Sequence, residues 1–328
     1  MSTVDPAQSH IPAVAVVIPA RNCLSHLPAA FACVAAQGVG DMEIIVVDDG
    51  SDDGTGDWLE SRRDLVPGLI TLRGEGDGPN VSRNRAIAAA RAPLIAFLDA
   101  DDLWMPGKLA AQLAFHRANP HVAFSFTDYL HVDPGGREHG TSFEFWPRFR
   151  RSAVSGGDGY RILDRAYAQI LAENVVGTSS VVATRIALQT ASGFDASLRS
   201  AADWDLWLRL ARAGAVAFTP TVGMRYLMQR PGSVSGNLGL RIECMHRIVA
   251  AHAPAVLASG EIEAVRHAQA HLRTTEAELA RSEARYASAA AANLRALLSV
   301  PSARSARACL RDLLAAATTG HVGPLSGR

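Results

Sequence analysis

The chain has 328 residues, of which 48% are hydrophobic and 20% charged, enough for one large globular domain with an appended region. Its 32 basic and 32 acidic residues cancel, which excludes a global electrostatic field that would recruit nucleic acid or an anionic membrane. The four cysteines form no C-x-x-C pair, which argues against a disulfide scaffold or a zinc site and favours a reducing compartment.

Short apolar runs alternate with helix-like segments through the first 120 residues. The runs cover residues 14–18, 43–47, 69–72 and 94–98, and the helix-like segments cover 24–37, 54–62 and 79–91. Strands that are apolar on both faces and alternate with helices are typical of a parallel sheet covered by helices. The pattern therefore predicts an α/β fold with a Rossmann-like, mostly parallel sheet sandwiched by helices.

The pattern continues less regularly after Pro106. It predicts a helix to residue 119, strands over 121–132 and 178–184, and a helix over 203–213. Residues 133–160 show no clear periodicity, and their aromatic and arginine side chains between Phe143 and Arg151 suggest a functional loop on the acceptor side of a site.

The character of the sequence changes near residue 240. Residues 261–317 are rich in Ala, Leu, Arg and Glu at helical spacing, and Pro301 is expected to separate two helices. We predict a flexible N-terminus over 1–12, an α/β domain over 13–240 and an α-helical C-terminal region over 241–328.

We find no secretory signal at the N-terminus and no run of ~18 uninterrupted apolar residues. We therefore expect a cytoplasmic protein. Peripheral attachment at the inner face of the plasma membrane, or a protein contact through the C-terminal helices, stays an open alternative.

Three polar clusters follow the predicted strands. They are Pro19–Asn22, Asp48–Ser51 and Asp99–Asp102. Ligands of parallel α/β sheets bind outside the carboxyl ends of the strands, so we expect the three clusters to form one site.

The cluster Asp99-Ala100-Asp101-Asp102 places three carboxylates within four residues. Such groups repel one another unless a cation lies between them, and Mg²⁺ or Mn²⁺ characteristically joins a few carboxylates to a phosphate. A solvated acidic turn ahead of the next helix is the alternative interpretation of the same residues.

These motifs occur together in an order that resembles the family 2 inverting glycosyltransferases, which have the A-type glycosyltransferase fold. The resemblance covers residues 13–236 and rests on these strings: Val17–Asn22, Val46–Ser51, Ser82–Asn84, Phe97–Asp102, Gly193–Asp195, Asp203–Arg209 and Pro231–Ser235. It implies transfer of a sugar from a nucleotide-diphosphate sugar to a hydroxyl of a glycan, lipid-linked or other acceptor, in synthesis of bacterial cell-surface polysaccharide, glycolipid or glycoconjugate. It also implies Mn²⁺ or Mg²⁺ as cofactor and no nucleic-acid partner.

The resemblance assigns roles to individual residues. Nucleotide-sugar contacts are expected from Pro19, Ala20, Arg21, Asp48, Asp49, Arg83, Asp99, Ala100, Asp101 and Arg230. Asp101 or Asp102 is expected to contact the metal directly. The turn-forming sequence around Asp49 also fits a purely structural role.

Asp203 matches the position of the catalytic base. Asp205 points about 200° away from it on a helix and has Arg209 at the i,i+4 spacing of an ion pair. A cap at the start of the helix is the alternative role for Asp203.

The chain departs from the family pattern at Ala202, where Glu is usual, and at Arg230, in a segment where many relatives carry His. These departures keep open a second hypothesis, a catalytically degenerate nucleotide-binding or partner-binding protein. The Gly-rich loops of dehydrogenases and P-loop enzymes are missing after the first strand.

Overall fold

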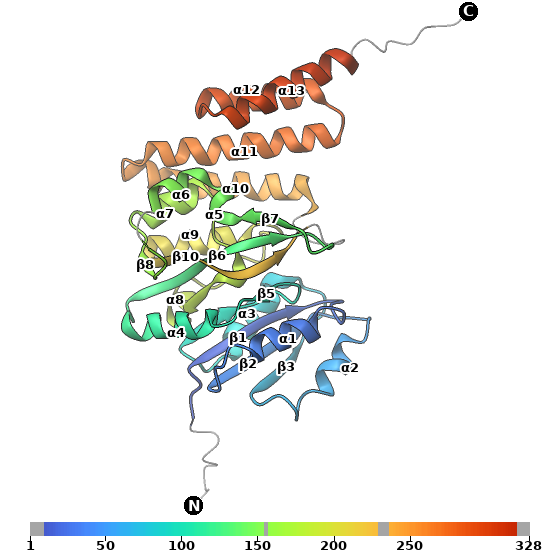
Figure 1. The fold of residues 1–328 in the computed structure, drawn as a ribbon, viewed down its shortest axis with the longest axis vertical. Helices are drawn as coiled ribbons and strands as arrows, with labels where there is room; N and C mark the ends of the chain where they lie inside the picture. Colours follow the sequence, from blue (N-terminus) through green and yellow to red (C-terminus); the bar gives the residue numbers. More distant parts are fainter. Residues whose placement is uncertain (1–9, 154–156, 229–235, 320–328) are drawn as a thin grey trace, which may run out of the picture. The chain divides into compact units, whose positions relative to one another are not determined.

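The structure, a computed structural model, describes residues 10–153, 157–228 and 236–319 (Figure 1). The chain forms two compact units. The first comprises residues 1–166 and 175–231, and the second comprises 167–174 and 232–328. Of the predicted N-terminal segment 1–12, residues 1–9 and their predicted flexibility lie outside the described ranges.

The first half of the first unit follows the predicted alternation of strands and helices. Its elements are β1 (Val14–Ala20), α1 (Leu27–Ala35), β2 (Met42–Asp48), α2 (Thr55–Glu60), β3 (Leu69–Arg73), α3 (Pro79–Ala89), β4 (Leu94–Phe97), β5 (Leu103–Trp104), α4 (Lys108–Ala118) and β6 (Val122–Val132). The apolar runs at residues 14–18, 43–47, 69–72 and 94–98 therefore form strands, as predicted.

The second half adds short elements around two long ones. They are β7 (Glu138–Thr141), α5 (Ser142–Phe145), α6 (Pro147–Ala153), β8 (Arg161–Ile162), the 3₁₀ helix η2 (Thr178–Ser180), β9 (Val182–Thr184), α8 (Arg185–Thr190), α9 (Ala202–Ala213) and β10 (Ala215–Leu227). Helix α7 (Ala166–Ala172) interrupts them in the sequence and, from Tyr167 on, belongs to the second unit. These strands join the same sheet, whose main order is β3-β2-β1-β4-β9-β6-β10-β5.

Strands β3, β2, β1 and β4 pair in parallel, and β9 pairs antiparallel to both β4 and β6. Val16, Ile45 and Phe97 are fully buried in the sheet. Helix α9 buries Trp204 and Trp207, with the ring of Trp207 5.8 Å from that of Phe97. The fold is thus the predicted α/β sheet, with an antiparallel strand inserted at its centre.

The predicted strand over residues 178–184 is only half correct. Residues Thr178–Ser180 form a 3₁₀ turn, in which the Ser180 hydroxyl donates to the Gly177 carbonyl over 2.7 Å. The hydroxyl side chains bond to backbone and carboxylate groups here, in competition with a strand ladder. The strand begins only at Val182.

Residues 138–153, within the stretch that shows no clear periodicity, form a strand and two short helices. Thr141 and Glu144 form a capping box that starts α5. The rings of Phe143 and Phe149 are buried 4.8 Å apart, and both pack near Phe126. This part of the expected acceptor loop therefore belongs to the core.

The second unit is helical. Its long helices are α10 (Leu238–Ala258), α11 (Ile262–Ser282), α12 (Tyr286–Ser299) and α13 (Ala303–Thr319), and each packs against the next along the chain. Pro301 lies between α12 and α13, as predicted. Of the helices in the described ranges, none combines the length and the apolar character needed to cross a membrane.

Candidate functional site

The three polar clusters lie at the same edge of the sheet. Strand β1 pairs in parallel with β2 on one side and β4 on the other, with Ala20 opposite Asp48 and Val17 opposite Phe97. The backbone N–H of Asp49 donates to the Ala20 carbonyl over 2.8 Å. The register therefore brings the ends of these strands together, as the sequence predicted.

Asp49 organises the loop that leads into α3. Its Oδ1 accepts hydrogen bonds from the backbone N–H groups of Gly76 and Asp77, both at 3.1 Å, and its Oδ2 accepts one from Gly78 at 2.7 Å. A Cβ atom at Gly74 would clash with Asp49 Oδ1, which these hydrogen bonds hold in place, so the loop favours glycine there. Asp49 is 3% exposed, and through these bonds its carboxylate holds the backbone of the loop before α3 in place.

The other predicted nucleotide contacts surround the same loop. Asp48 Oδ1 accepts from the backbone N–H of Ser51 at 3.1 Å, and the exposed Arg21 donates from Nη1 to the Gly76 carbonyl at 3.4 Å. Pro19 is half-buried and Ala20 is buried at the end of β1.

Arg83 joins α3 to the acidic loop. Its Nη2 lies 2.5 Å from Asp99 Oδ1, and its guanidinium carbon lies 5.3 Å from the centroid of the Phe194 ring. The next residue, Asn84, exchanges two 2.8 Å hydrogen bonds with the backbone of Phe194. The motifs around Arg83 and Phe194, more than a hundred residues apart, are thus parts of one structure.

Residues of η2 connect the acidic loop to Asp203. The Ser179 hydroxyl accepts from the Asp99 backbone N–H at 2.9 Å and donates to Asp102 Oδ2 at 2.6 Å. The Thr178 hydroxyl donates to Asp203 Oδ2 at 2.9 Å. Two adjacent hydroxyl residues therefore place Asp203 beside the acidic loop.

Sequence reasoning missed Thr178 and Ser179 because it assigned them to a strand. The signal that could have found them is the run of three hydroxyl residues, Thr178–Ser180, between apolar segments. Buried hydroxyls need hydrogen-bond partners, so such a run next to a predicted site points to its supporting contacts.

Asp102 is the most buried carboxylate of the acidic loop, with 2% of its surface exposed. Besides the bond from Ser179, its Oδ1 accepts from the backbone N–H of Leu227 at 3.3 Å. Burial raises the pKa of Asp102 well above its ordinary value, and the nearby charges of Asp99 and Asp101 raise it further. Ala100, between them, is buried.

The chemistry of the acidic loop fits a hard divalent cation. A cation beside the loop would relieve the like-charge repulsion that raises the pKa of Asp102. Mg²⁺ needs only one or two carboxylates when substrate phosphates and water complete its shell. Within the described ranges no group of three or more His, Cys, Asp or Glu side chains forms a metal cage by itself.

Asp203 occupies the first turn of α9 rather than the cap, since the N-cap residue is Ala201 with a left-handed φ of 53°. Asp203 Oδ1 accepts from the Trp204 backbone N–H at 2.9 Å. Asp205 instead pairs with Arg209 at 2.8 Å, as the spacing predicted. The two aspartates of this helix therefore have different partners.

A buried lysine lies behind η2. Lys108 Nζ donates to Gln112 Oε1 at 2.7 Å and lies 4.4 Å from the centroid of the Trp104 ring, whose Nε1 donates to the Ser179 carbonyl at 2.7 Å. Burial lowers the pKa of Lys108 to about 7. The indole that binds the Ser179 carbonyl thus packs against a desolvated amine.

Arg230 and the segment Pro231–Ser235 lie outside the described residues.

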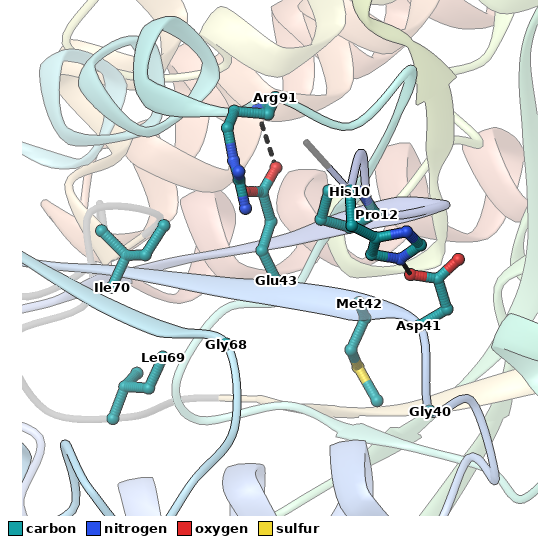
Figure 2. A pocket seen from close by; sticks show the side chains of 10 residues that line it. All are labelled: His10, Pro12, Gly40, Asp41, Met42, Glu43, Gly68, Leu69, Ile70 and Arg91. Carbon is teal, nitrogen blue, oxygen red and sulfur yellow. Dashed lines mark hydrogen bonds and ion pairs between the residues drawn. The ribbon is translucent and has the colours of Figure 1, made fainter. Parts of the chain in front are cut away.

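A separate cavity of about 370 Å³ lies at the amino ends of β1, β2 and β3 (Figure 2). Its lining includes Glu43, whose Oε1 accepts from the backbone N–H groups of Arg91 and Ala92. The acidic loop follows the carboxyl end of β4, whereas this cavity lies at the amino ends of the parallel strands. The cavity is therefore at the opposite edge of the sheet from the acidic loop and is not the candidate site.

Comparison with known families finds a match over residues 15–171 to the family described as Glycosyl transferase family 2. TuaG of Bacillus subtilis, a glycosyltransferase ascribed to teichuronic acid biosynthesis, is 29% identical over 208 residues, which cover 63% of this chain and 75% of that protein. A chondroitin synthase of Escherichia coli is 24% identical over 62% of this chain, but the match spans only 27% of the synthase.

Solved structures show the same fold. TarS 1–349 of S. aureus in complex with UDP superposes with a TM-score of 0.61 at 18% identity, covering 93% of this chain and 87% of that one. The mannosyltransferase PcManGT of Pyrobaculum calidifontis, in complex with GDP-Man and Mn²⁺, has a TM-score of 0.59 at 18% identity, covering 96% and 82%.

Replacing Ser179 tests the link between η2 and the acidic loop. Ser179→Ala removes a donor to Asp102 and the acceptor of the Asp99 N–H, so we expect the free energy of unfolding to fall by about 1–3 kcal/mol. Ser61→Ala, which removes a hydroxyl at an exposed position, serves as control and should change it by less than about 0.5 kcal/mol. Urea denaturation measures both, and equal midpoints for the two variants would contradict the assigned role.

The lowered pKa of Lys108 predicts that the free energy of unfolding depends on pH. Its folded pKa of about 7 lies below that of an unfolded lysine, so the unfolded chain binds more protons between these two values. The unfolding free energy should therefore rise with pH from about 7 to 10, by at most about 1.4 kcal/mol per unit. Lys108 is the only lysine in the chain, so Lys108→Met should remove this slope. Parallel stability curves for the two proteins across this range would refute the prediction.

Proposed function

We propose that the chain is a family 2 glycosyltransferase, which moves a sugar from a nucleotide-diphosphate sugar to an acceptor hydroxyl with inversion, assisted by Mn²⁺ or Mg²⁺. The observation that carries the proposal is a series of hydrogen bonds whose members are joined by short stretches of the chain. It runs from Asp49 through the loop before α3 to Arg83 and Asp99, and through Ser179 and Thr178 to Asp203.

The donor is proposed to bind across the ends of β1, β2 and β4. TarS and PcManGT are described in complex with UDP and GDP-Man, which supports a nucleotide-sugar donor. Pro19, Ala20, Arg21, Asp48 and Asp49 would then line the nucleoside side. Arg83 and Arg230 would provide positive charge for the diphosphate, because guanidinium groups bind phosphate oxygens in pairs.

The burial of Asp102 and the hydrogen bonds to both of its oxygens favour Asp101 as the direct metal ligand. Both carboxylate oxygens of Asp102 already accept hydrogen bonds, from Ser179 and from Leu227 N–H, and the side chain is almost fully buried. Asp101 is only half-buried. When bound, the cation stabilises the negative charge that develops on the departing diphosphate. Asp102 then holds the loop from behind.

Asp203 is the proposed general base. Thr178 and the Trp204 N–H each donate one bond to its carboxylate, which fixes its orientation and leaves each oxygen a lone pair. The acceptor oxygen forms a bond to the anomeric carbon of the sugar as the bond to the diphosphate breaks. The acceptor proton passes to Asp203, and the bonding electrons leave with the nucleoside diphosphate.

We also propose that residues 13–240 form the catalytic domain and 241–328 an accessory helical region. The names of relatives such as TuaG favour cell-surface polysaccharide or a related glycoconjugate as the product. Assembly of such polymers at the cytoplasmic side of the plasma membrane is part of this proposal.

Replacing the proposed base separates chemistry from donor binding. Asp203→Asn should lower turnover by about 10²–10⁴ because the amide cannot accept the acceptor proton, while donor affinity changes less than about twofold. Asp205→Asn is the matched control on the same helix, since its partner is Arg209, and it should keep turnover within a few-fold of the native value. Steady-state kinetics and donor titration measure both quantities. Near-native turnover of Asp203→Asn would remove this residue from the mechanism.

A thermal-shift screen tests the donor site and the cation together. UDP, GDP and dTDP are added with and without Mn²⁺, and a ligand at about 100 times its dissociation constant should add about 2.7 kcal/mol to stability. We expect one nucleotide to raise the midpoint strongly only with the cation, and Asp101→Asn to abolish the cation's contribution. If no nucleotide raises the midpoint with either Mn²⁺ or Mg²⁺, the proposed donor site is wrong.

A further inference from the structure

Leucine and arginine side chains occupy the part of the α13 surface that does not pack against the rest of its unit. The packed face of the helix carries Asp312, whose Oδ2 accepts from Arg281 Nη1 at 3.0 Å and from Asn293 Nδ2 at 2.7 Å, and the buried Cys309. The helix is the last element of the second unit and packs against α12 (Figure 1).

An apolar sector lies on the side of α13 away from Asp312. Leu310, Leu313 and Leu314 are 58%, 53% and 61% exposed. At 100° per residue, these leucines fall within about 100° of arc, together with Ala303, Ala306 and Ala317. Large aliphatic side chains at i, i+3 and i+4 on a solvent face indicate a surface that is covered by something outside this unit.

A basic sector borders the apolar one along one side. Arg304, Arg307 and Arg311 are exposed and follow one another at spacings of three and four residues. Arg311 also lies 3.5 Å from the buried Asp312 through its Nε, while its side chain stays 63% exposed. From residue 286 to 319 the sequence has four arginines and a single carboxylate, and that carboxylate is the buried Asp312. The outward charge of α13 is therefore wholly positive.

Helix α12 repeats the arrangement. Leu294 and Leu298 are 47% and 74% exposed at the i,i+4 spacing, and the exposed Arg295 lies beside them. The apolar and basic composition of the outward surface is thus a property of both terminal helices.

We propose that the outward surface of α13 docks on an anionic lipid bilayer, with its leucines in the headgroup and acyl boundary and its arginines on lipid phosphates. An amphipathic helix with leucines on one sector and arginines on the next lies in the plane of an interface. A second copy of the chain fits less well, because the face offers no exposed carboxylate to pair with the facing arginines.

Vesicle sedimentation of the full chain tests the proposal. We expect binding to vesicles of phosphatidylcholine with about 30% phosphatidylglycerol, little binding to pure phosphatidylcholine, and release in about 0.5 M salt. Replacing Arg304, Arg307 and Arg311 with Gln together should weaken binding on the order of a hundredfold. Replacing Leu310, Leu313 and Leu314 with Gln should weaken it more than about tenfold.

The matched controls are Leu65→Gln and Ile186→Gln, which alter equally exposed apolar side chains of the first unit and should leave vesicle binding unchanged. All these positions are exposed, and unchanged far-UV circular dichroism establishes that the variants fold. Failure of the native chain to bind anionic vesicles overturns the proposal, as does native binding by the leucine variant. A native dimer that the leucine variant converts to monomer, measured by light scattering, would assign the face to a second copy instead. None of these outcomes depends on sugar transfer, so they are independent of the proposed function.

Discussion

The mutual repulsion of the carboxylates in the acidic loop is the constraint on which the rest of the site depends. Asp99, Asp101 and Asp102 follow a buried strand, and Asp102 is itself almost fully buried, so its charge cannot simply be solvated. The protein stabilises them with three kinds of donor: the guanidinium of Arg83, the hydroxyl of Ser179 and the backbone N–H of Leu227. Each donor comes from a different part of the chain, so the loop holds those parts together.

The same contacts join motifs that lie far apart along the chain. Asp49 holds the glycine-rich loop before α3, which sets the start of the helix that carries Arg83 and Asn84. Asn84 in turn binds the Phe194 turn, and α9 follows with Asp203. A change in any one of these segments moves the donors that the acidic loop requires. The motifs are therefore a single structural unit around the edge of the sheet.

The buried polar groups beneath the acidic loop contribute both to the stability of the fold and to the geometry of the candidate site. Lys108, Trp104 and Ser179 form a continuous set of contacts beneath the acidic loop, in which the lysine is desolvated. Such interiors stabilise the fold less well than apolar packing would, since each polar group must find a partner. Here the Trp104 indole holds the backbone carbonyl of Ser179, whose hydroxyl binds Asp99 and Asp102 of the acidic loop.

The sequence by itself determined the strands of the parallel sheet, the helix that carries Asp203 and the polar clusters at the strand ends, because apolar runs that alternate with helical segments are local and repetitive signals. It also separated Asp205, with its partner Arg209 one turn away, from Asp203. Only the tertiary structure decided that Thr178 and Ser179 form a 3₁₀ turn joining Asp203 to the acidic loop, and that Phe143 and Phe149 belong to the core. These features depend on partners between 17 and 80 residues distant in the chain, which no local pattern encodes.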